Sequence, residues 1–137
     1  MYPILFSLIL GVFAAYGFIW LVASKSRHAD RVFRIGLVVA AIIYLNLAWI
    51  YDASSSVLMI EGAGVLVFLI VALASMGRFV KLLAWGWLTH PVWDLVLHAP
   101  VGSYTHAPEW YVFACLSFDV IVGMYLLKRE SGEHEAN

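Results

Sequence analysis

Long apolar stretches alternate with short polar segments along the chain. Apolar residues dominate five stretches, at positions 2–24, 35–51, 57–75, 82–98 and 109–127. Each is close to the roughly 17–25 residues with which an α-helix crosses the hydrocarbon of a bilayer. They lack the strict alternation that marks the strands of a membrane barrel. The pattern therefore predicts an all-α polytopic protein: one domain at 1–128 with five transmembrane helices, and a polar tail at 129–137.

The basic residues predict how these helices are oriented. All of them follow the first, third or fifth stretch: Lys25, Arg27, Arg31, Arg34, Arg78, Lys81, Lys128 and Arg129. With five spans, these three segments lie on one side of the membrane, which the positive-inside rule identifies as the cytoplasm. The N-terminus is then predicted outside and the C-terminus in the cytoplasm.

Composition supports a membrane protein and narrows the partners. Of the 137 residues, 64% are hydrophobic and 12% are charged, whereas a soluble domain carries about 25% charged residues. The lipid bilayer is therefore the expected surroundings. A net charge of −1 predicts no nucleic-acid partner, and the single cysteine excludes an intrachain disulfide.

The ionisable residues inside the predicted spans all lie between the outer boundary and the midplane. Asp119 is about 15 Å into the last span and Glu61 roughly 6 Å into the third, at 1.5 Å per residue. A charged carboxylate in mid-membrane costs roughly 2.5–3.5 kcal/mol on insertion scales. Glu61, Asp94 and Asp119 must therefore face one another, be protonated or bind a cation. We expect the third, fourth and fifth helices to converge around them, with Asn46 at the margin.

The densest polar cluster lies on the fourth span. His90, Asp94 and His98 follow each other at i, i+4 and i+8, so they share one helix face. Histidines and carboxylates at this spacing can chelate a divalent metal such as zinc or iron. We predict His90, Asp94 and His98 as metal ligands. Asp119 and Glu61 are predicted to complete the site or to act catalytically.

Three functions remain open at this point. A bound metal could serve hydrolysis of a lipid-like substrate, with a carboxylate as general base. Chains of Asp, Glu and His also build proton and ion pathways, which would make the protein a transport component. The same residues could instead form a structural clamp in a scaffold or in a subunit of a larger complex. Whether the protein is an enzyme stays open, as does its oligomeric state.

A longer motif resembles a known family. The run Gly86-Trp87-Leu88-x-His90-x-x-Trp93-Asp94-x-x-x-His98 is followed by Ala107-Pro108 and by Cys115-x-x-x-Asp119. This pattern is similar to that of a bacterial family of small integral membrane proteins known as a domain of unknown function. The resemblance covers about the C-terminal two-thirds of the chain, and Glu61 matches a glutamate in the preceding helix. It implies five spans in the bacterial cytoplasmic membrane and adds no activity.

The chain departs from that family at two positions. Leu97 stands where the family has the first of two paired histidines, and Phe118 replaces the second cysteine of its C-x-x-C-D run. The second departure argues against dithiol chemistry.

Overall fold

The computed structural model describes residues 2–25, 28–77, 80–98 and 107–135. Within these ranges the chain forms five α-helices and no strands, which confirms the all-α prediction. The helices are α1 (Tyr2–Lys25), α2 (Ala29–Ile50), α3 (Ser55–Ala74), α4 (Val80–His98) and α5 (Glu109–Glu135). Four of them, α1, α2, α3 and α5, are long and apolar enough to cross a membrane. Helix α4 falls outside this set because its His, Asp and Thr residues lower its mean hydropathy.

The helices extend beyond the apolar stretches that predicted them. Helix α2 begins at Ala29 rather than near position 35, and α5 continues through the polar segment to Glu135. Polar residues end an apolar stretch without breaking backbone hydrogen bonding, so a helix can continue into water. These two extensions meet, since the Arg129 guanidinium donates to the Asp30 carboxylate.

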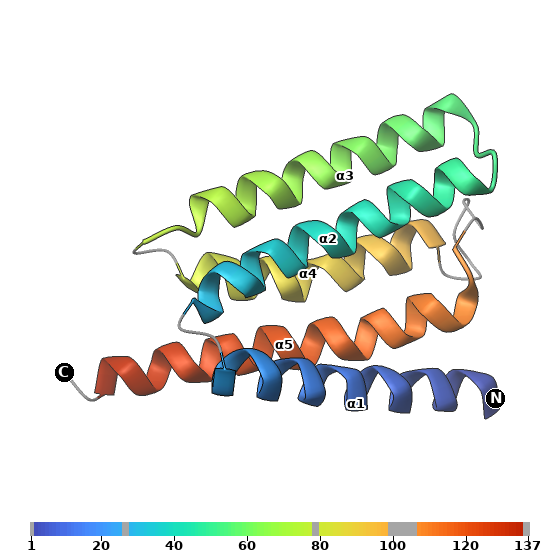
Figure 1. Ribbon diagram of the computed structural model, residues 1–137. Coiled ribbons are helices and arrows are strands. Elements are labelled where there is room, and N and C mark those ends of the chain that lie inside the picture. Colours follow the sequence, from blue (N-terminus) through green and yellow to red (C-terminus); the bar gives the residue numbers. More distant parts are fainter. Residues whose placement is uncertain (1, 26–27, 78–79, 99–106, 136–137) are drawn as a thin grey trace.

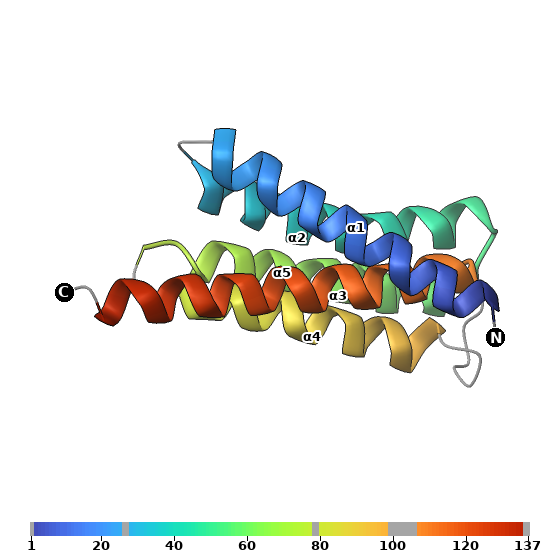
Figure 2. The ribbon, with the colours of Figure 1, turned by 90° about the horizontal axis from the view of Figure 1, so that it is seen from below.

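The helices follow the order α1, α5, α4, α3, α2 around the bundle; neighbours run antiparallel except α1 and α5, which run in the same direction (Figure 1). Figure 1 shows α1 beside α5 and α2 beside α3, with α4 between the two pairs. The most extensive contacts join α4 to α5 and α1 to α5, whereas α1 and α2 contact each other little. The view from below shows α1 running obliquely to α5 (Figure 2). The ring of helices is therefore loosely closed between α1 and α2.

A small residue brings α1 close to α5. A Cβ atom on Gly11 would lie 2.1 Å from the carbonyl oxygen of Ala114, so any side chain there would force the helices apart. Three residues after Ala114 on α5, Ser117 donates its hydroxyl proton to the carbonyl oxygen of Leu8 on α1 at 2.8 Å. This is the close approach that small residues permit between membrane helices.

The outer surface and the helix ends suit a bilayer. Large apolar side chains stay exposed on several helices, among them Phe6, Phe13, Trp49, Leu73 and Val96. The described basic residues lie in the parts of the helices at one end of the bundle, where α1 and α5 end and α2 and α4 begin; Figure 1 shows these helix ends side by side. Of the other basic residues, Arg27 and Arg78 lie outside the described residues.

Candidate metal centre

The five residues predicted for the site are all buried. His90 and Asp94 are 0% exposed, Asp119 is 1%, Glu61 is 2% and His98 is 3%. They come from three helices, with Glu61 on α3, the histidines and Asp94 on α4, and Asp119 on α5. The expectation that these polar groups face inward is confirmed. They separate into two groups.

The first group consists of His90, Asp94 and Asp119. The Nδ1 atom of His90 lies 2.9 Å from Oδ2 of Asp119 and 3.3 Å from Oδ2 of Asp94. One nitrogen or oxygen atom from each residue falls within 4.8 Å of the others. His90 is about 12 Å from the C-terminal end of α4 and Asp119 about 15 Å from the start of α5, at 1.5 Å per residue. Antiparallel packing of α4 on α5 therefore brings them to the same depth.

The donor set of this group fits a divalent cation. Ligand bonds of about 2.0–2.2 Å in a tetrahedral site place neighbouring ligand atoms about 3.4 Å apart. A singly protonated Nδ1 can donate to only one carboxylate, and Asp119 is the nearer. Both Asp94 oxygens and Nε2 of His90 are buried without a hydrogen-bond partner among the described residues. Such unpaired polar atoms are costly in an apolar interior, and a cation would satisfy the Asp94 oxygens and balance the charge of both carboxylates.

The second group pairs His98 with Glu61. Nε2 of His98 lies 3.0 Å from Oε1 of Glu61, which links α4 to α3. Two i, i+4 steps rotate the side-chain direction by about 80°, so His90 reaches α5 while His98 reaches α3. The predicted ligands His90 and Asp94 are thus joined by Asp119, and His98 lies with Glu61 instead. The roles given to these residues from sequence remain predictions.

Aromatic rings surround both histidines, and sequence reasoning missed two of them. The ring of Tyr44 stacks on His98 at 4.7 Å with an interplanar angle of 11°, and its centroid is 6.0 Å from His90. Phe68 meets His90 edge-on at 4.7 Å. The signal for Tyr44 was its position on the buried stripe of α2, in helical register with Leu37 and Ala48.

Asn46 does not contribute to the site, contrary to the expectation from its depth. It is exposed, and its Nδ2 donates to the carbonyl oxygen of Ile42 at 3.1 Å in its own helix. A membrane-facing amide can satisfy itself in this way.

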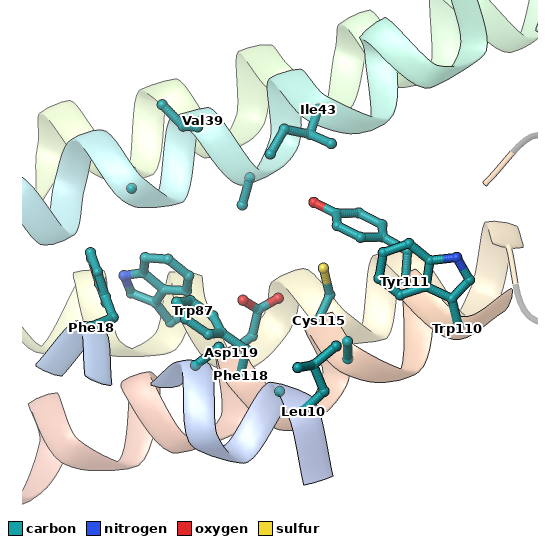
Figure 3. Close-up of a pocket in the computed structure, with 15 residues that line it drawn as sticks. Leu10, Phe18, Val39, Ile43, Trp87, Trp110, Tyr111, Cys115, Phe118 and Asp119 are labelled. Atoms are coloured by element: carbon teal, nitrogen blue, oxygen red, sulfur yellow. The ribbon is translucent and has the colours of Figure 1, made fainter. Parts of the chain in front are cut away.

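An open cavity adjoins the group on the side of α1 and α2. Its volume is about 370 Å³, and Asp119 lines it whereas His90 and Asp94 do not. The walls are otherwise mostly apolar, with Val39 and Ile43 on the opposite side and Phe18 beside Trp87 at one end (Figure 3). On the side of α3, the space bounded by Glu61, His90 and Asp94 is too small to admit water. The group is therefore approachable through Asp119.

The structure also places the residues of the family-like motif. His90 and Asp94 belong to the first group, and the Trp93 ring packs so closely on Gly64 that a Cβ there would lie 2.9 Å away. No family model, curated protein or solved structure matches the chain. The resemblance to a family of unknown function stays a prediction.

Proposed function

We propose that this protein is a five-span membrane protein that binds one divalent metal ion, such as zinc or iron, through His90, Asp94 and Asp119. The observation that best supports this proposal is the position of His90. Its Nδ1 atom lies 2.9 Å from the carboxylate of Asp119 and 3.3 Å from that of Asp94, and both carboxylates are buried. We place the N-terminus outside and the C-terminus in the cytoplasm of a bacterial cell.

Helix α4 is the fifth span in this proposal. Its 19 residues reach about 28 Å at 1.5 Å per residue, close to the roughly 30 Å of bilayer hydrocarbon. The residues that lower its mean hydropathy, His90, Asp94 and His98, are buried within the protein. Polar groups shielded from lipid in this way are tolerated in a spanning helix.

The proposal extends to hydrolysis of a lipid-like substrate. A divalent ion at this position would act as a Lewis acid toward a carbonyl oxygen and would lower the pKa of a bound water. Asp119 would then be both a ligand and the site's contact with the cavity. Glu61 stays a candidate for an acid–base role from the opposite side, where it pairs with His98.

A structural clamp is the second candidate, and the Glu61–His98 pair favours it. Together with the His90–Asp119 contact, this pair ties α4 to both α3 and α5. An ion pathway has less support, because the buried side chains described toward the cytoplasmic end are mostly apolar, including Phe33, Leu83 and Leu126. A relay would need polar groups there.

Metal analysis of purified variants separates these functions. We expect wild-type protein reconstituted with zinc to carry near one equivalent by mass spectrometry. Asp94→Asn and Asp119→Asn each remove a ligand charge with little change of shape, and we expect both to lose most of the metal. Glu61→Gln is the matched control, since it neutralises an equally buried carboxylate outside the group.

The outcomes are distinct. Metal retained in the control and lost in both aspartate variants supports the site. Wild type that binds neither zinc nor iron contradicts the proposal and leaves the clamp. Loss of metal in His98→Gln would return His98 to the ligand set, as the sequence predicted.

A further inference from the structure

The cavity between α1, α2 and α5 has the length of one lipid chain in one leaflet. Along α1 its lining runs from Leu10 to Phe18, and along α5 from Trp110 to Asp119. These stretches rise about 12–14 Å, close to half of the roughly 30 Å of bilayer hydrocarbon. Its volume of about 370 Å³ lies in the range of about 300–1,000 Å³ typical of small-molecule pockets.

Polar atoms are confined to one wall. Tyr111, Cys115 and Asp119 follow each other at i, i+4 and i+8 on α5, and all three line the cavity. Figure 3 shows the Tyr111 hydroxyl, the Cys115 sulfur and the Asp119 carboxylate turned toward the open space. The facing wall, from α1 and α2, is apolar. A ligand that matches both walls has a hydrocarbon chain and one polar group.

The position of the cavity selects a ligand that arrives through the membrane. It is partly open where α1 and α2 contact each other little, and its apolar walls disfavour water-soluble compounds. None of the residues that line the cavity is basic, so it offers no side-chain partner to an anionic head group. A helix from a second copy is about 10–12 Å wide with its side chains, too wide for this volume.

We propose that the cavity binds one hydrocarbon chain of an uncharged outer-leaflet lipid, with the lipid's polar group beside Asp119. The inference deepens the proposed function and rests on it for the role of that polar group, because it names the substrate class that reaches the metal. Tyr111 and Cys115 lie between the outer boundary and Asp119 along the cavity wall. Phe18 and Trp87 would pack against the hydrocarbon chain of the lipid.

Photocrosslinking tests this assignment. The probe is a monoacylglycerol with a diazirine on its acyl chain, added to the protein in phosphatidylcholine nanodiscs. We expect saturable crosslinks on cavity-lining peptides of α1 and α2. Unlabelled monoacylglycerol should compete, whereas lysophosphatidic acid, with the same kind of chain and an anionic phosphate, should compete poorly.

Two alanines provide a matched pair of variants. Ala14 lines the cavity and Ala63 lies on α3 outside it, and both are exposed. Ala14→Trp fills the cavity, so we expect about tenfold weaker saturable labelling, equivalent to about 1.4 kcal/mol. Ala63→Trp should label as wild type does. Thermal unfolding in detergent serves as the folding control for Ala14→Trp.

The inference is overturned if labelling is unsaturable and spreads equally to α3, or if Ala14→Trp labels like Ala63→Trp. Equal competition by the host phosphatidylcholine or by lysophosphatidic acid contradicts the choice of an uncharged lipid. Crosslinking between two copies of the chain would make the cavity an interface. Because Asp94 does not line the cavity, labelling should persist in Asp94→Asn, so failure of the metal site and failure of the lipid site are distinguishable.

Discussion

His90 shares one nitrogen between two buried carboxylates, and this arrangement sets the chemistry of the whole site. Only one of the two, Asp94 or Asp119, can receive a proton from Nδ1 at a time. Burying an isolated carboxylate costs far more than a hydrogen bond returns. One imidazole cannot balance the charge of two buried carboxylates, and this excess negative charge favours a bound cation over a purely structural role for this group.

The Glu61–His98 pair should act on stability and not on metal binding. Glu61→Leu leaves Nε2 of His98 without this acceptor, so we expect unfolding to become easier by about 1–3 kcal/mol. Glu61→Gln keeps an acceptor oxygen and should cost less. Thermal unfolding in detergent compares the two with wild type. Equal stability of Glu61→Leu and wild type would show that the 3.0 Å contact contributes little.

At this scale the sequence predicted which residues are buried better than which residues meet. Depth and insertion cost identified Glu61, Asp94 and Asp119 as inward groups. The i, i+4, i+8 spacing suggested one shared site for His90, Asp94 and His98, but the rotation between His90 and His98 directs them to different helices. Partners across a bundle depend on helix packing, which a single sequence does not contain.

The decisive element is α4, which carries His90, Asp94 and His98 and is the described helix that does not qualify as a membrane span by length and hydropathy. Its buried polar residues His90, Asp94 and His98 contact α3 and α5, while apolar residues of α4 such as Val92 and Val96 are exposed. Apolar length predicted where all five helices lie. It did not predict the polar extensions of α2 and α5. Hydropathy indicates which residues favour an apolar environment, whereas a helix ends where its backbone hydrogen bonds end.

Cysteine labelling tests whether α4 crosses the membrane. In a Cys115→Ala background, single cysteines replace Asp52 after α2, Met76 after α3 and Glu109 at the start of α5, all of which are exposed. We expect an impermeant maleimide to label positions 52 and 109 on intact cells, and position 76 only after permeabilisation. The positive-inside rule fixes this direction. Labelling of positions 76 and 109 from the same side would mean that α4 does not cross.

In the whole molecule, polar and apolar interiors occupy different halves. The described buried ionisable side chains lie in the half of α3, α4 and α5 that we place outward, and the larger apolar cluster around Phe33, Trp87 and Leu126 fills the other half. Loose contact between α1 and α2 leaves the cavity beside Asp119. Sequence patterns could not reveal that opening, since it depends on how α1 pairs with α5 through Gly11.

This arrangement predicts a site that faces the outer leaflet and is closed toward the cytoplasm. A metal held there would be reached from the lipid by way of Asp119. The described apolar cluster in the other half gives little support to an ion route, which favours this account over transport.

X-ray absorption spectroscopy of the zinc-loaded protein tests the metal site most directly. The account predicts a first shell of nitrogen and oxygen atoms at about 2.0–2.2 Å, with the outer-shell signal of one imidazole and no sulfur. Two imidazoles would place His98 in the ligand set beside His90, and a sulfur ligand would implicate Cys115. Either result, or the absence of any ordered zinc shell, would contradict a site built from His90, Asp94 and Asp119.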